Sequence, residues 1–278
     1  MSELGEALEV MHTSAQRWNT LRLEGHEWRK HDALRRAWEH HFDEVRKGGA
    51  SVQSVVAFKT AGEDAPNESS YSWRVWLAKP EKRRAEYRVG DEIVAVIYVG
   101  AHWWSRSPRG FQTNDGASNS RHGFGPAEAL LSPADYLTSL NLSVEGRTTV
   151  LSRSAFLVTA LPRMPQDDPH DMTLHMLGTG ADRYRLVVDV EVGVLLRSEA
   201  EFGGEVFRII EADAIGINEE FSANTFDGER LRTGELRLGE RCEWRGTSAQ
   251  RRKVGEAWGG RLRTQARVYE IRMAVLPE

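Results

Sequence analysis

The segment from Ser72 to Trp104 constrains the fold more than any other part of the chain. It contains three strand-like runs in succession, separated only by Lys79-Pro80-Glu81 and by Gly90-Asp91. Gly, Asp and Pro between apolar runs are typical of tight turns, and Pro80 suits such a position because it cannot donate to a sheet. Three runs joined in this way predict an antiparallel meander.

Side chains alternate along the meander. In its first run Trp73, Val75 and Leu77 fall on one face, so this face is apolar and carries a large aromatic side chain. The run from Ile93 to Val99 is apolar on both faces. That pattern predicts a central strand that is covered on each side, and helices elsewhere in the chain are the expected cover.

Helical and strand-like patterns also occur outside the meander. Apolar residues recur every three or four positions from Leu4 to Trp18 and from His31 to Lys47, and a shorter helix is expected from Pro126 to Leu140. Further strands are expected at Thr20 to Arg29, Ser51 to Lys59, Leu142 to Val150, Ser154 to Leu161, Arg183 to Val190, Val194 to Phe202 and Glu205 to Ile217.

Two long loops interrupt these elements. The segment from Ser105 to Gly125 is rich in Ser, Gly, Asn and Arg and has no period, as is typical of lids, binding loops and insertions. The loop from Pro162 to Gly180 contains a group of residues with metal-ligand chemistry: Asp167, Asp168, His170, Asp171 and His175. Their spacing matches no metal motif, so we interpret them as solvated loop charges.

The chain changes character near residue 229. The whole chain has a net charge of -4, whereas Arg and Lys outnumber Asp and Glu from Glu229 onward. We expect residues 1–228 to form one domain and residues 229–278 to form an extension of a strand, a helix and a strand packed on it. The basic extension is either a contact surface or a solvated one.

Composition excludes several classes of protein. The net charge of -4 offers no general attraction to nucleic acid. It therefore also disfavours the idea that Arg106, Arg109 and Arg121, with their aromatic neighbours, clamp a nucleic acid strand. Cys242 is the only cysteine, so no intrachain disulfide is expected.

The first residues and the apolar runs bear on location. Glu3, Glu6 and Glu9 stand where a signal peptide needs basic residues and then an apolar run. No apolar run approaches the length that crosses a membrane. As written, the chain is expected to be cytoplasmic; a start further upstream that encodes a signal peptide would make it periplasmic or otherwise extracytoplasmic.

Catalytic motifs are missing from the sequence. We find no Gly-rich phosphate loop, no nucleophile elbow, no zinc-protease motif and no paired cysteines. Asp189 and Glu191 would share a face of one strand, as a catalytic carboxylate pair requires, but they flank a hairpin turn where solvated acidic residues are common. We therefore expect a protein that is not an enzyme and that needs no cofactor or metal.

Four stretches together resemble the bacterial lipoprotein-carrier superfamily, which comprises LolA- and LolB-like outer-membrane lipoprotein carriers and RseB-like periplasmic sigma-factor regulators. They match its strand, Pro turn and Arg-bearing strand, its strand ending in an aromatic pair, its helix after a long loop, and its acidic hairpin. The stretches are Trp73 to Glu86, Asp91 to Trp104, Leu130 to Leu142 and Asp189 to Arg197. Ser152-Arg153 replaces the Gly-Arg often found in the family, and the secretion signal is missing.

The resemblance implies a fold of the α+β class, an unclosed antiparallel β half-barrel of about ten strands whose concave face is covered by helices. It also implies binding of a lipid or another apolar small molecule on that face, with the Ser105 to Gly125 loop as a lid. Six residues are the expected lining: Trp73, Val75, Leu77, Tyr87, Ile97 and Trp104. The alternatives are that these side chains fill the space themselves, or that the half-barrel is a regulatory module that recognises a protein partner.

Overall fold

In a computed structural model, residues 2–47, 66–89, 92–108, 110–114, 125–163 and 173–233 are described. Their strands are β1 (Thr20–Lys30), β2 (Glu68–Ala78), β3 (Lys82–Val89), β4 (Glu92–Val99), β5 (His102–Ser107), β6 (Gly110–Thr113), β7 (Leu140–Val150), β8 (Arg153–Pro162), β9 (Arg183–Asp189), β10 (Leu195–Phe202) and β11 (Glu205–Ile217). The helices are α1 (Glu3–His12), α2 (His31–Lys47), α3 (Glu128–Leu131) and α4 (Glu229–Thr233), and the 3-10 turns are η1 (Ser14–Gln16), η2 (Gly125–Ala127), η3 (Pro133–Tyr136) and η4 (Thr173–Met176).

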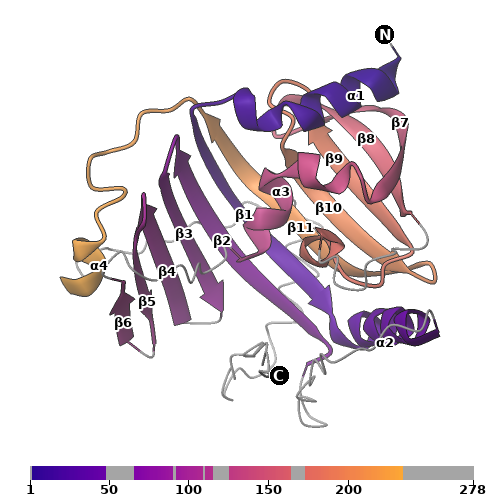
Figure 1. Cartoon of the computed structure of the whole chain (residues 1–278), viewed down its shortest axis with the longest axis horizontal. Helices are drawn as coiled ribbons and strands as arrows, with labels where there is room; N and C mark the ends of the chain where they lie inside the picture. The colour runs from indigo at the N-terminus through magenta and orange to yellow at the C-terminus, as the bar shows by residue number, and fades with distance from the viewer. Residues whose placement is uncertain are drawn as a thin grey trace.

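The strands of the described residues form one antiparallel sheet of eleven strands, in the order β6-β5-β4-β3-β2-β1-β11-β10-β9-β8-β7. The first strand therefore lies in the middle, paired with β2 on one side and with β11 on the other. The meander β2 to β6 extends one way and the meander β11 to β7 extends the other (Figure 1). Because β6 and β7 end the order and do not pair, the half-barrel is unclosed, as the sequence led us to expect.

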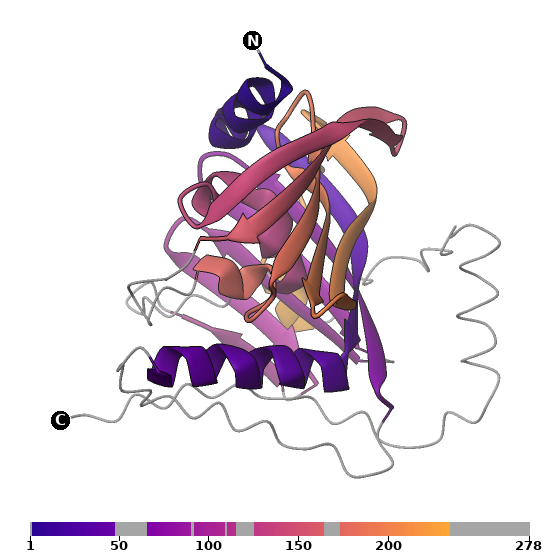
Figure 2. The ribbon, with the colours of Figure 1, turned by 90° about the vertical axis from the view of Figure 1, so that its right-hand side faces the viewer.

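The sheet curves around a main apolar core on its concave face. The turns η2, α3 and η3 lie over the centre of this face, while α1 lies at one end of the sheet and α2 at the other (Figures 1 and 2). Contacts of η2 with β1 and β2, and of α3 with β10, attach this central segment to strands from both halves. We call the segment Gly125 to Tyr136 the concave cover.

Most expected elements are confirmed, but two expectations are wrong in part. The segment from Ser105 onward begins with the hairpin of β5 and β6, so its first part is strand rather than loop. The helix expected at Pro126 to Leu140 is instead split into η2, α3 and η3. Pro133 explains the split, because a residue before proline avoids the helical region, and Ser132 has φ -124° and ψ 59°. The strand expected at Ser51 to Lys59 lies outside the described residues.

Part of the outer face of the sheet, over β4 and β5, is covered by the segment that follows β11. This segment runs from Asn218 to Thr233, and we call it the outer strap; it crosses to β5 and ends in α4 (Figure 1). Phe226 and Leu231 of the strap pack with Ala95 and Ile97 in a second apolar cluster. The prediction that β4 is covered on both faces is therefore confirmed, with the strap as the outer cover. The rest of the 229–278 extension lies outside the described residues.

No helix in the described ranges is long and apolar enough to cross a membrane.

Candidate ligand-binding site

The concave wall is built by strand alternation on β1 and β2. Trp73, Val75 and Leu77 point inward, and they are 2%, 0% and 7% exposed. Trp73 pairs across the strands with Gly25. A Cβ at Gly25 would overlap the Glu211 carbonyl oxygen and would lie 2.5 Å from Cζ2 of Trp73, so glycine is required where β11 and the indole ring approach β1. The three residues that the sequence puts on one apolar face of this strand therefore lie on the concave face.

Tyr87 of β3 continues this wall. It pairs across the strands with Trp73 and packs against the main core with its side chain half-buried. Burial raises the pKa of the Tyr87 phenol well above its ordinary value, so the group is neutral at any physiological pH. Four of the six expected lining residues therefore share one apolar surface.

Ile97 and Trp104 lie on the opposite face. They are cross-strand partners on β4 and β5, and both belong to the second cluster beneath the outer strap. Trp104 Nε1 donates a hydrogen bond to Glu229 Oε1 at 3.3 Å. Val96 and Tyr98 take the inward positions of β4 instead. The six residues therefore do not line one surface, because a strand that is apolar on both faces leaves its orientation undecided by hydrophobicity alone.

The concave cover fills the space above the wall. Ala127, Ala129 and Leu130 are fully buried in it, and the Tyr136 hydroxyl donates to the Ala129 carbonyl at 3.2 Å. A ligand on this face would have to displace the cover. One polar atom of the wall is left over: Trp73 Nε1 is buried and has no hydrogen-bond partner among the described residues. A buried indole N–H usually has an acceptor.

A cluster of buried charges lies further along the same face, and the sequence analysis missed it. Glu27 is fully buried and accepts from Arg29 Nε at 2.6 Å and from Arg208 Nε at 2.6 Å. Burial alone would raise the pKa of the Glu27 carboxyl, but the charges of Arg208 and Arg29 outweigh it and hold the pKa below its ordinary value. Leu21 and Leu23 point inward, so strand alternation puts Glu27 on the same inward face. A charged residue at an inward strand position could therefore have been recognised from the sequence.

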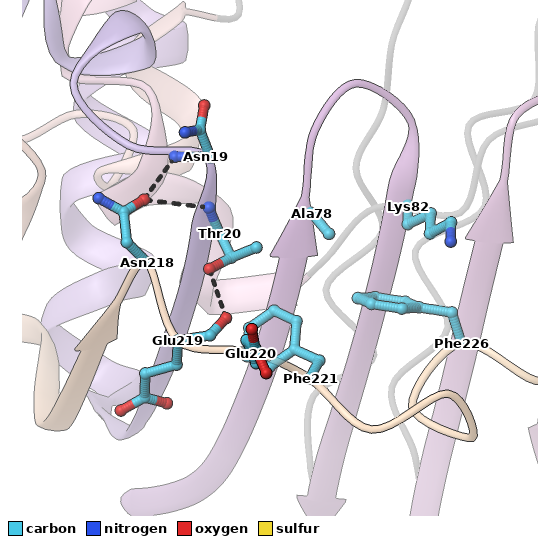
Figure 3. Close-up of a pocket in the computed structure, with 9 residues that line it drawn as sticks. All are labelled: Asn19, Thr20, Ala78, Lys82, Asn218, Glu219, Glu220, Phe221 and Phe226. Atoms are coloured by element: carbon cyan, nitrogen blue, oxygen red, sulfur yellow. Dashed lines mark hydrogen bonds between the residues drawn. The ribbon is translucent and has the colours of Figure 1, made fainter.

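A surface pocket of about 420 Å³ lies where the outer strap leaves the sheet (Figure 3). Asn218 Oδ1 accepts from the backbone N–H groups of Asn19 at 2.8 Å and of Thr20 at 3.5 Å, and Thr20 Oγ1 donates to the Glu219 carbonyl at 2.7 Å. None of the six expected residues lines this pocket, whose lining is Asn19, Thr20, Ala78, Lys82, Asn218, Glu219, Glu220, Phe221 and Phe226. Its hydrogen bonds fix the start of the strap to β1.

The remaining acidic and histidine candidates fall into two groups. Residues 167, 168, 170 and 171 lie outside the described residues, whereas His175 lies edge-on to Trp38 with ring centroids 5.6 Å apart. Within the described ranges no group of three potential ligands is placed to hold a metal ion. Asp189 is buried rather than solvated, because it accepts from Arg153 Nη2 at 3.1 Å and from the Val192 N–H at 2.8 Å. It therefore fixes the hairpin turn.

Comparison with known proteins gives structural matches. No family model and no curated protein matches the chain. A structure of the Pseudomonas aeruginosa MucA/MucB complex matches at 12% identity and a TM-score of 0.44, over 81% of this chain and 60% of the matched chain. The Mycobacterium tuberculosis lipoprotein LppX matches at 11% identity and a TM-score of 0.43, over 80% of this chain and 99% of that one.

A LolA superfamily protein from Nitrosomonas europaea also matches, at 8% identity and a TM-score of 0.30, over 81% of this chain and 98% of that one. The chain spans about three fifths of the matched chain in the MucA/MucB structure. The class of fold, an unclosed half-barrel with a covered concave face, follows from the strand order itself.

Proposed function

We propose that this protein is a non-catalytic binding protein that holds the apolar chain of a lipid or a similar molecule between the concave wall and the concave cover. The observation that carries the proposal is the contrast between the two surfaces. The wall is a continuous apolar surface on hydrogen-bonded strands, whereas the cover consists of a four-residue helix between two 3-10 turns. So short a helix has almost no stability of its own, and packing alone holds it down.

Replacement of the cover by an alkyl chain would conserve apolar contact. Each methylene group buried on the wall stabilises the complex by about 0.8 kcal/mol, so a chain of ten or more carbons has enough contact to compete with Leu130 and its alanine neighbours. The unpartnered N–H of Trp73 supports the same proposal. A ligand with an ester or another acceptor along its chain would supply the partner that the protein lacks there.

Native mass spectrometry of the full chain after mild extraction tests the proposal. We expect added mass that corresponds to a bound lipid, and saturable binding of a fluorescent fatty acid by the delipidated protein. A protein that carries no lipid and binds no fluorescent fatty acid would contradict the proposal.

A protein-interaction function is the second candidate, and the outer face favours it. Ile97, Trp104 and Phe111 would form an exposed apolar patch if the outer strap moved away, and the strap leads directly into the basic extension. A partner that competes with the strap would then bind this patch. Pull-down with the full chain and with a Leu231→Asp variant tests this: the variant should capture more of the partner, and equal capture would argue against the second candidate.

A further inference from the structure

Two arginines face each other on the concave side of the sheet. Arg29 of β1 and Arg208 of β11 are cross-strand partners. Like charges at such positions repel, and here Glu27 lies between them and takes a hydrogen bond from each. Arg29 also donates from Nη2 to the second oxygen of Glu27 at 2.9 Å. One carboxylate therefore serves two guanidinium groups.

The cluster retains one net positive charge. Glu27 is the only carboxylate that forms an ion pair with either arginine among the described residues. Arg208 Nη1 donates to the carbonyls of His175 and Met176, at 3.3 and 2.8 Å. Arg208 Nη2 makes no hydrogen bond with the described residues. Nη1 of Arg29 also makes none with the described residues. Two donors of the cluster are thus available to an anion or to water.

The surroundings report the same excess of positive charge. Burial lowers the pKa of His175, and the nearby charges of Arg208 and Arg29 lower it further. Burial lowers the pKa of His31 too. The charge of Arg29 lowers this pKa further, and it has a larger effect than the charge of Asp32, which raises it. The nearby positive charge therefore disfavours the protonated form of both imidazoles.

The cluster is reachable and lies on the proposed binding face. The Arg29 side chain is 33% exposed, with its guanidinium 5.4 Å from the centre of the Tyr71 ring. Along β1 the inward positions run from Arg29 through Glu27 and Gly25 to the apolar wall at Leu23. In the cross-strand row of Glu27, the buried hydroxyl of Ser198 has no partner among the described residues. The concave face is thus charged at one end and apolar along the rest.

We propose that Arg29, supported by Arg208, binds the carboxylate headgroup of a single-chain amphiphile whose alkyl chain lies on the concave wall. This inference rests on the proposed function and specifies its ligand class. A planar guanidinium suits a carboxylate because it offers two parallel N–H groups. One negative charge also balances the single excess positive charge, whereas a dianionic phosphate would leave a buried negative charge uncompensated.

Titration calorimetry of the full chain with four probes tests the inference: dodecanoate, 1-dodecanol, dodecylammonium and acetate. We expect dodecanoate to bind at least about tenfold more tightly than dodecanol, which corresponds to about 1.4 kcal/mol, and dodecylammonium to bind most weakly of the three chains. Acetate should bind far more weakly than dodecanoate. Equal affinity of dodecanoate and dodecanol would overturn the headgroup site alone, and acetate as tight as dodecanoate would overturn the amphiphile. Failure of all three chains would overturn the proposed function as well.

Arg29→Gln and a matched variant, Arg35→Gln on the exposed surface of α2, locate the site. Arg29→Gln should abolish the preference for dodecanoate and leave dodecanol binding within about twofold, while Arg35→Gln should keep the preference. Glu27 keeps Arg208 as its partner in Arg29→Gln, so we expect a folded variant, which circular dichroism verifies. A preserved dodecanoate preference in folded Arg29→Gln would contradict the assignment. Should that variant unfold, the four-probe comparison on the unaltered chain decides.

Discussion

At the scale of single residues, the most consequential feature is a carboxylate that has no contact with water. Glu27 is buried on the concave face and is matched by Arg29 and Arg208. Glu27 is not among the residues predicted from sequence to form the site, although alternation on β1 assigns it to the same face as Leu21 and Leu23. A charged residue at an inward strand position can be recognised from sequence; its two partners come from distant strands, and their placement depends on the register.

Glu27→Gln should destabilise the protein by about 3 kcal/mol, because it leaves the largely buried Arg208 and the partly exposed Arg29 facing each other without a countercharge. Chemical denaturation measures the free energy of unfolding. Glu39→Gln is the control, because Glu39 is exposed and forms a surface ion pair with Arg35 at 4.0 Å. We expect this variant to lose less than about 1 kcal/mol of unfolding free energy. Similar losses in both variants would contradict the account of a buried charge cluster.

His26 on the outer face should make stability depend on pH. Burial lowers the pKa of His26, but the hydrogen bond and charge of Asp213 and the charge of Glu211 outweigh burial and raise the pKa above its ordinary value. Protonated His26 therefore contributes stability that is fully present below about pH 6.5 and is lost as the pH rises through the raised pKa.

The stability difference between the unaltered chain and His26→Gln should then be larger at pH 5.5 than at pH 8.5. Thermal unfolding at both pH values provides the comparison. Asp213 lies 3.1 Å from His26 Nδ1 and is the principal partner, so Asp213→Asn should remove most of the same pH dependence. A difference that does not change with pH would show that the ion pair is not formed.

At the scale of elements, the sheet could be predicted, the concave cover only in part, and the outer strap not at all. Each strand carries its own alternation and its own turn signals, which is why the meander from Ser72 onward and the strands from Leu142 to Ile217 were found. The concave cover carries a helical signal, but Pro133 breaks the helix and packing decides the shape of the separate pieces. For β4 the apolar residues on both faces hid its orientation, and Ile97 was assigned to the wrong surface for the same reason.

The two covers offer a matched pair of substitutions. Leu130 of the concave cover and Leu231 of the outer strap are 0% and 1% exposed, so Leu→Ala removes the same atoms from equally buried sites and should cost about 2–5 kcal/mol in each. Leu130→Ala weakens the cover that a ligand displaces, so it should tighten fatty-acid binding severalfold. Leu231→Ala should leave binding unchanged. The opposite pattern in a fluorescent fatty-acid titration would place the ligand under the strap.

The strap itself depends on a close approach of backbone and ring. A Cβ at Gly228 would overlap the indole of Trp104, so Gly228→Ala should displace the strap and destabilise the protein by about 1–3 kcal/mol. Trp104→Ala removes the obstacle, so the double variant should be less destabilised than the sum of the single variants. Additive losses in the denaturation measurements would show that Gly228 and Trp104 do not touch.

At the scale of the whole molecule, the described residues form an open sheet with an apolar concave face and a smaller apolar area over β4 and β5 on the outer face, each covered by a segment of its own. The unclosed half-barrel was expected only from the resemblance of four stretches to a known superfamily, and the strand order confirms it. The sequence did not show whether the inward side chains line an open cavity or fill the space themselves, because buried aromatic side chains have the same pattern in both cases. The structure shows the wall covered by protein, and binding would therefore require the cover to move.

Photo-crosslinking with a fatty acid that carries a diazirine in its alkyl chain tests the central claim most directly. We predict that peptide mapping places the crosslinks in β2, around Trp73 and Val75, and in the concave cover around Leu130, and that excess dodecanoate suppresses them. Crosslinks confined to the second cluster, around Ile97 and Leu231, or crosslinks that dodecanoate does not suppress, would contradict binding on the concave face.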